Sequence, residues 1–275
     1  MSIEAAIAQL QQQLTLTLTR RAGAAHPSAL LTVLFERAAA RSEATTFDRW
    51  IGEDDRLHPV GGGAEWLDAW FAALPDPFLR DHYGGLTLVS RGEPPLTLHY
   101  SRDFGPWFDR VRISIPWGAA PGERTTLTAA QLVELVALAA AAFSAEVAWL
   151  ASFELLAAVR SATSGGVNDI GVPAAAFARF TTLQPHGQID SAAVPEAVGW
   201  VNVWSPAVVD AIGRARVTAA PWQLRREVDG GWLLIATTEV PDRAHADAMA
   251  RVAEIVEAID LAGAHRRHPA PALEA

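Results

Sequence analysis

Alternation of apolar and polar residues with a period of two recurs along the first half of the chain. It is clearest in Leu14–Thr19, where leucine and threonine alternate, and it returns in 85–90, 96–100 and 111–115. This period places successive side chains on opposite faces of a β-strand, so one face is apolar and is expected to be buried. The last three segments follow one another through short links, which predicts an antiparallel meander. Such a sheet needs other elements to cover its apolar face.

Helices suited to this task are predicted between and after the strands. Ser28 is the expected N-cap of a helix with an apolar stripe. Thr128 and Gln131 have the spacing of a capping box, followed by apolar residues at helical spacing. Two shorter helices are expected over 2–13 and 64–73.

Several stretches are less regular. Residues 46–63 contain Trp50, lack a consistent period and end in three glycines, which predicts a loop region. Residues 145–160 fit either a buried strand followed by a short helix or one continuous helix, because periodicity does not separate the two. A long loop is predicted over 161–196, which is rich in Ser, Gly and Pro, and a flexible tail over 264–275.

The last third repeats the rhythm of strand and helix. Residues 200–204 predict a short strand, and Ser205 is the expected N-cap of a helix over 206–213. The turn residues Asp229-Gly230-Gly231 predict a hairpin. Asp242 is the expected N-cap of a long amphipathic helix.

The order of these elements predicts an α+β fold, with antiparallel sheets flanked by helices. We expect a single domain over 1–275. An arrangement of two similar α/β halves packed together, 14–160 and 197–261, is compatible with the same order.

Composition excludes several classes of chemistry. The chain has 31 acidic and 22 basic residues, a net charge of −9, which disfavours nucleic acid and anionic membranes as partners and favours a basic protein. It has no cysteine, which excludes disulfides, thiolate metal sites and a cysteine nucleophile. It has no lysine, which excludes Schiff-base chemistry and lysine-dependent phosphate loops. The common hydrolase, metalloprotease, dinucleotide and kinase motifs are missing, so we expect no catalytic site, metal or cofactor.

Tryptophans in loop-like contexts beside carboxylates are candidates for a binding surface. Trp50, Trp107 and Trp117 have this setting, and they serve either as exposed anchors for a partner or as plugs at the ends of the sheet. The acidic run near Trp50 is either a solvated turn or a patch that steers a basic partner. The candidate partner-facing residues are Asp48, Trp50, Glu53, Asp54, Asp55, Asp103 and Trp107.

Histidines offer an alternative. His82 and His99 fall near the ends of neighbouring predicted strands and, with Asp103, would form the acid/base site of a small hydrolase or transferase. The competing interpretation is that they line a half-buried sheet edge. His265 and His268 are interpreted as part of the solvated tail rather than as metal ligands.

Several short segments carry a resemblance to a known family. They are Phe47–Trp50, the strand from Gly85, Leu96–Tyr100, Val111–Pro116, the Gly-Trp-Val-Asn-Val-Trp-Ser element of Gly199–Ser205 and the hairpin at Gly231. In this order they resemble the immunity protein 52 family, antidote proteins of bacterial polymorphic-toxin and type VI secretion systems. The resemblance implies an α+β fold and a toxin, typically a nuclease, as partner.

The family pattern falls on Trp50, Gly199, Trp200, Asn202 and Ser205, and we interpret most of these as architectural. In this interpretation Gly199 permits close packing, Trp200 and Trp204 share one face of a strand, and Ser205 caps the next helix. The sequence thus predicts a cytoplasmic immunity protein that occludes its toxin without catalysis. An enzyme or an adaptor that loads a secreted effector are the alternatives.

Overall fold

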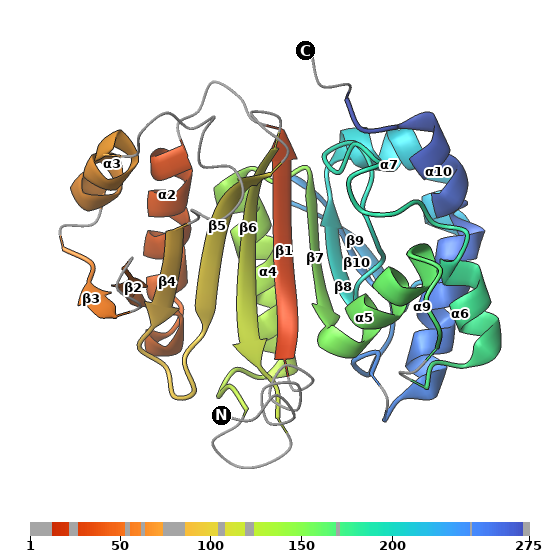
Figure 1. The fold of residues 1–275 in the computed structure, drawn as a ribbon, viewed down its shortest axis with the longest axis horizontal. Coiled ribbons are helices and arrows are strands. Elements are labelled where there is room, and N and C mark those ends of the chain that lie inside the picture. Colours follow the sequence, from red (N-terminus) through yellow and green to blue (C-terminus); the bar gives the residue numbers. More distant parts are fainter. Residues whose placement is uncertain are drawn as a thin grey trace. The chain divides into compact units, whose positions relative to one another are not determined.

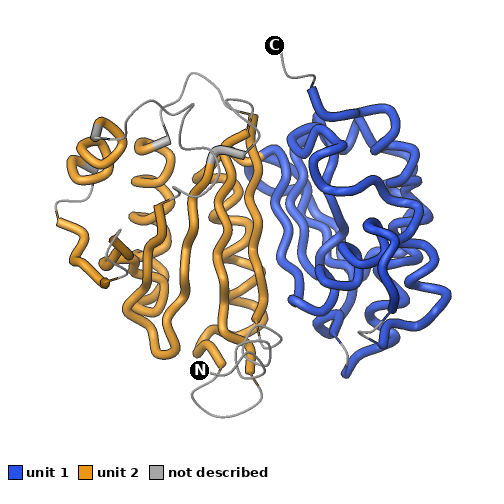
Figure 2. The backbone as a smooth tube through the Cα atoms, in the orientation of Figure 1, with its two compact units in different colours: residues 1–11, 146–275 blue, residues 12–145 orange. Residues whose placement is uncertain are grey.

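A computed structural model describes most of the chain as two compact α+β units. Unit 2 spans Gln12–Ala145, and the described residues of unit 1 lie within Glu146–Ala275 (Figure 2). The predicted fold class, α+β with antiparallel sheet, is confirmed. The described residues are 13–21, 27–52, 56–61, 64–73, 86–103, 108–118, 124–168, 171–242 and 244–271.

Unit 2 contains an antiparallel sheet of six described strands in the order β3-β2-β4-β5-β6-β1. The predicted meander is confirmed, since β4 pairs with β5 and β5 with β6, both antiparallel. The N-terminal strand then pairs with β6 over its whole length. The strands are β1 (Gln13–Arg21), β2 (Phe47–Ile51), β3 (Leu57–Pro59), β4 (Leu86–Ser90), β5 (Thr97–Asp103) and β6 (Phe108–Pro116).

The period-two alternation sorts this sheet into an apolar face and a polar face. Leu16 and Leu18 of β1 lie opposite Ile113 and Val111 of β6, and all four are buried. Helices α2 (Pro27–Ala39) and α4 (Ala129–Phe143) lie behind the sheet in Figure 1 and pack against each other. The expectation of one buried face is incomplete, because Thr17, Thr19 and Arg110 on the opposite face are also buried.

Capping residues explain where the helices of unit 2 begin. The Thr128 hydroxyl accepts the Gln131 N–H and the Gln131 side chain accepts the Thr128 N–H, so the predicted capping box is confirmed. Ser28 does not cap its helix: α2 begins at Pro27, and the Ser28 hydroxyl donates to Asp68 at 2.5 Å. Asp68 lies on α3 (Ala64–Ala73), which confirms the helix predicted over 64–73.

The prediction of a loop over 46–63 is wrong for β2 and β3. Non-local pairing forms these strands, since β2 pairs with β4 on one side and with β3 on the other. A register shift between Phe47 and Arg49 marks a β-bulge, which explains why the segment lacks an alternating sequence pattern.

Unit 1 contains four described strands in the order β7-β8-β10-β9, all antiparallel. Residues 145–160 form a strand followed by a helix, the first of the two alternatives. The predicted strand at 200–204 and the hairpin at Asp229-Gly230 are confirmed. The strands are β7 (Val147–Ser152), β8 (Val201–Trp204), β9 (Leu224–Val228) and β10 (Gly231–Ile235).

Six described helices accompany these strands and share one hydrophobic core cluster with them. Ser152 caps the first by accepting the Leu155 N–H at 3.1 Å, and Ser205 caps α7 by accepting the Val208 N–H at 3.4 Å, as predicted. The helices are α5 (Phe153–Thr163), α6 (Ala174–Phe180), α7 (Pro206–Ile212), α8 (Arg214–Ala219), α9 (Ala246–Ala258) and α10 (Leu261–Arg267).

Three boundary predictions in unit 1 are wrong. Residues 161–196 are not one loop, because α6 forms within them and Phe180 is buried in the core. The segment 264–271 is not a flexible tail, because α10 continues to Arg267 and Pro269 forms a β-bridge with Ile189. Asp242 accepts the His245 N–H as a cap would, but α9 begins only at Ala246. The helix predicted over 2–13 lies, except for its last residue, outside the described residues.

His265 is a structural residue of unit 1 rather than part of a solvated tail. It is buried, its Nε2 lies 2.8 Å from the Pro195 carbonyl, and its Nδ1 lies 3.2 Å from the Gln184 N–H. These partners require a neutral ring that donates at Nε2 and accepts at Nδ1. Burial lowers the pKa of His265, and this outweighs the opposing effect of the hydrogen bond to Pro195.

Acidification is therefore expected to destabilise unit 1 through His265. Because the folded pKa is lowered, the unfolded chain binds the proton more readily, so the stabilisation is complete above the ordinary histidine pKa of about 6.5 and is lost as the pH falls below it. Urea unfolding followed by hydrogen exchange of α10, at about pH 7.5 and about pH 5, measures the effect. His265→Gln should flatten this dependence, whereas the control His268→Gln should not. An unchanged dependence in His265→Gln would contradict the assignment.

Candidate functional site

An aromatic cluster holds the β2–β3 edge of unit 2 in place. The Trp50 ring on β2 lies 5.2 Å from the His58 ring on β3 and 5.7 Å from the Trp66 ring on α3, measured between ring centroids. Trp50 and His58 are also opposite each other in the strand register. All three side chains are half-buried. Aromatic pairs at such distances contribute about 0.5–1.5 kcal/mol beyond their buried area, so the cluster makes this edge rigid.

Two exposed apolar side chains lie side by side on the opposite face of this edge. Ile51 and Leu57 form a cross-strand pair in the register, with 37% and 52% of their surface exposed. Only two other large apolar residues among the described ones are exposed, Val167 and Leu224, and both belong to unit 1. A pair of exposed apolar residues on a rigid edge strand has the character of a docking surface. We call Asp48, Trp50, Ile51, Leu57, His58 and Trp66 the β2–β3 edge surface.

Asp48 contributes a compensated charge to this surface. Its Oδ2 lies 2.6 Å from Arg91 Nε, and its Oδ1 lies 3.6 Å from Arg49 Nε. The hydrogen bond and the charge of Asp48 raise the pKa of Arg91 above its usual value. Steering of a basic partner by a lone Asp48 carboxylate therefore finds no support in this geometry, and a contact role for Asp48 stays a prediction.

The other predicted partner-facing residues are not brought to this surface by the described structure. Glu53, Asp54, Asp55 and Trp107 lie outside the described residues. Asp103 is placed by its backbone at the end of β5, where it pairs with Phe108 of β6. Trp117, the third tryptophan of a loop-like context, is half-buried and stacks under Arg124 at 3.7 Å, so its ring already has a partner within the chain.

Strand geometry separates the two described residues of the alternative enzymatic site. His99 and Asp103 lie on the same strand four residues apart, which corresponds to about 13 Å between their Cα atoms. A direct hydrogen bond between the two side chains is therefore excluded. His99 Nδ1 instead lies 3.1 Å from the Thr87 hydroxyl on β4. His82 lies outside the described residues.

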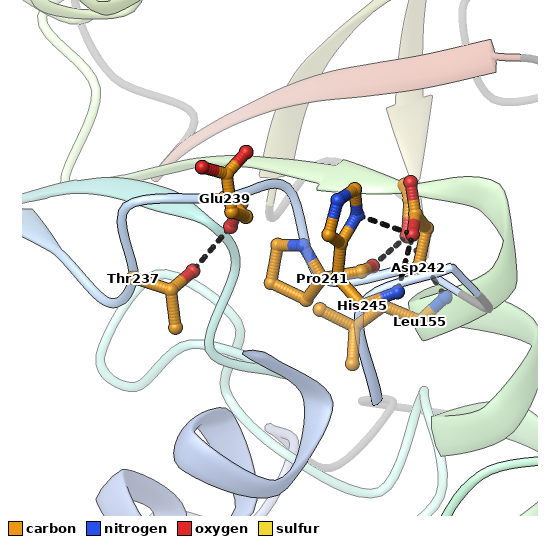
Figure 3. Close-up of polar contacts among 7 residues, drawn as sticks. Leu155, Thr237, Glu239, Pro241, Asp242 and His245 are labelled. Atoms are coloured by element: carbon orange, nitrogen blue, oxygen red, sulfur yellow. Dashed lines mark hydrogen bonds and ion pairs between the residues drawn. The ribbon is translucent and has the colours of Figure 1, made fainter. Parts of the chain in front are cut away.

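An aspartate–histidine pair that the sequence reasoning missed lies in unit 1, in the turn before α9. Asp242 Oδ1 is 2.8 Å from His245 Nδ1 and also accepts the His245 N–H, as Figure 3 shows. The nearby Ser152 hydroxyl donates to the Pro241 carbonyl and accepts the Leu155 N–H. The spacing Asp-x-x-His, typical of a capped turn, was the available signal. Because Ser152 is used to anchor this turn, the arrangement is explained as structural.

The glycine–tryptophan element of Gly199–Ser205 is a buried structural unit. Asn202 is fully buried; its Oδ1 accepts the Gly199 N–H at 2.8 Å, and its Nδ2 donates to the Gly199 carbonyl at 3.0 Å. A Cβ on Gly199 would lie 2.5 Å from the Leu150 carbonyl oxygen, which is the close packing that the sequence predicts. Trp204 is in β8 and in the core cluster, whereas Trp200 precedes the strand and its Nε1 donates to the Thr237 carbonyl.

Comparison with known proteins gives one structural likeness. A solved structure titled "Pseudomonas aeruginosa T6SS protein PA0821" aligns with 90% of this chain and 72% of its own chain, with a TM-score of 0.48 and 12% sequence identity. A match at this level establishes neither a shared family nor a shared function. No family model and no curated protein matches the chain, so the resemblance to the immunity protein 52 family stays a hypothesis.

Two searches of the described residues complete the description. No group of three or more His, Asp or Glu side chains in this part of the chain is arranged to hold a metal ion. None of the helices in the same residues combines the length and the apolar character that crossing a bilayer requires.

Proposed function

We propose that this protein is an immunity protein that binds a cognate bacterial toxin and neutralises it by occlusion, without catalysis. The observation that carries the proposal is the exposed pair Ile51 and Leu57, held on a rigid edge by Trp50, His58 and Trp66. Exposed apolar residues on a preorganised support provide affinity at low entropic cost. The resemblance of the sequence to the immunity protein 52 family indicates what kind of partner docks there.

A nuclease is the favoured class of toxin on grounds of charge. Nucleases bind a polyanion and therefore present basic surfaces around their active sites. A chain with a net charge of −9 is attracted to such a surface, and the attraction raises the association rate. In this proposal the long-range charge of the whole chain guides the encounter, and the apolar pair on the β2–β3 edge surface provides the contact.

Co-expression with the product of the neighbouring reading frame tests the proposal. We expect the two proteins to co-purify and the cells to survive expression of that toxin. Failure of both binding and rescue would contradict an immunity function. Binding only to a delivery segment outside the toxic domain would favour the adaptor alternative. His99→Ala should leave protection unchanged, whereas an enzyme that uses His99 would lose its activity.

Leu57→Asp is expected to weaken toxin binding by a factor of about 30, equivalent to about 2 kcal/mol, because it places a charge in the apolar centre of the contact. Val167→Asp is the matched control, since Val167 is 77% exposed and lies in unit 1. Isothermal titration calorimetry with the co-purified toxin measures both affinities. Equal affinities for the two variants would remove the β2–β3 edge surface from the interface.

A further inference from the structure

The strand β9 is an exposed edge that the proposed function does not use. It is the last strand in the order β7-β8-β10-β9, and β10 pairs with one of its two sides. Its first four residues, Leu224–Glu227, are all exposed, and Leu224 has 40% of its surface exposed. Because successive residues point to opposite faces, both faces of this strand are open. Alternate N–H and C=O groups on its outer side are directed away from β10.

Charged side chains on an edge strand ordinarily oppose pairing with another strand. The order Leu-Arg-Arg-Glu-Val of β9 behaves differently when it meets itself. In an antiparallel pair centred on Arg226, Arg225 lies opposite Glu227 of the second copy, and Leu224 lies opposite Val228. The register thus gives two opposite-charge pairs on one face and two apolar pairs on the other.

Backbone geometry permits the same register. Antiparallel strands hydrogen-bond only where outward-directed groups meet on both strands. Around a two-fold axis at Arg226 every residue pairs with one that lies an even number of positions away. Outward-directed groups therefore meet outward-directed groups across the whole pair, whichever alternate set of β9 points away from β10.

We infer that β9 is a self-complementary docking edge through which two copies of this chain form an antiparallel, two-fold symmetric dimer. Such contacts are isologous, so each stabilising pair occurs twice. The single unfavourable contact is Arg226 opposite its own copy at the axis. The short length of the strand and this like-charge contact make the dimer weak and dependent on concentration.

Charge exchange tests the register. Arg225→Glu and Glu227→Arg each replace two attractive pairs with two repulsive ones, so each should weaken dimerisation by roughly tenfold in sedimentation velocity. The double variant R225E/E227R restores the opposite-charge pairs and should recover dimerisation. Arg37→Glu, an exposed reversal on α2 of unit 2, is the control for net charge. A monomer at all concentrations, or equal effects of R225E and R37E, would overturn the inference.

Disulfide trapping tests the axis independently of the strength of the dimer. The chain has no cysteine, so Arg226→Cys introduces the only thiol. Opposed residues of an antiparallel pair have Cα atoms about 4.5–5.5 Å apart, within the range of a disulfide, so oxidation should yield a covalent dimer. Arg225→Cys is the control, because its own copy is displaced by two residues along the strand. Equal crosslinking of both variants, or none of Arg226→Cys, would contradict this register.

Discussion

Replacement of Asn202 by leucine is expected to lower the free energy of unfolding of unit 1 by about 3–5 kcal/mol. Leucine fills a similar volume, so the expected cost does not come from a cavity. It comes from the N–H and C=O of Gly199, which both hydrogen-bond to the Asn202 side chain at a fully buried position. Each buried backbone group that loses its partner costs about 1–3 kcal/mol.

Asn168 provides a matched control for this prediction. Its Oδ1 accepts the Val172 N–H at 3.2 Å and its Nδ2 donates to the Val172 carbonyl at 2.6 Å, the same pattern as at Asn202, but the residue is exposed. Water replaces these bonds in Asn168→Leu, so its cost should stay below about 1 kcal/mol. Urea unfolding, with hydrogen exchange of β8 and β10 to assign the loss to unit 1, compares the two variants. Similar costs would mean that Asn202 does not stabilise the element through buried hydrogen bonds.

Local signals in the sequence were sufficient for the elements that depend on neighbouring residues. The capping box of Thr128 with Gln131 and the cap at Ser205 involve residues three positions apart, and both form as predicted. The alternation in Leu14–Thr19 and the turn residues of the β9–β10 hairpin are equally local. Short-range hydrogen bonds and side-chain period determine these features, so a single sequence contains the information.

Elements that depend on distant partners were not predictable in the same way. β2 is a strand because β4, about forty residues later, pairs with it, and its bulge removes the alternation that would reveal it. His265 is buried by contacts with Gln184 and Pro195, about seventy to eighty residues earlier. Its neighbours Arg266 and Arg267 are exposed, and they gave the segment the composition of a solvated tail.

The candidate site was predicted in part for the same reason. Trp50 was selected as an aromatic beside carboxylates, and the structure places it at the sheet edge with a half-buried ring. Ile51 and Leu57 were missed, because an apolar residue in a sequence is expected to be buried. Their exposure follows from the position of β3 at the end of the strand order. The available signal was the pair of apolar residues on either side of a turn rich in Gly, Glu and Asp.

The hairpin at Gly230 and Gly231 separates backbone strain from steric contact, two reasons for which a position requires glycine. Gly230 has φ +82°, but a Cβ there would meet no atom within 4 Å. Gly231 has no such φ, but a Cβ there would lie 2.2 Å from the Trp204 carbonyl oxygen and 2.8 Å from its carbonyl carbon. Trp204 is fully buried and paired on β8, so its backbone has little room to move.

Gly231→Ala is therefore expected to destabilise unit 1 by about 3 kcal/mol or more, since β8 and β10 must separate to admit the methyl group. Gly230→Ala should cost only about 1–2 kcal/mol, the strain of a left-handed conformation in an L-residue. Urea unfolding gives both free energies, and hydrogen exchange should show faster opening of the β8–β10 pair in Gly231→Ala alone. If Gly230→Ala were the more costly variant, strain in the turn rather than the close approach of the two strands would determine the requirement for glycine here.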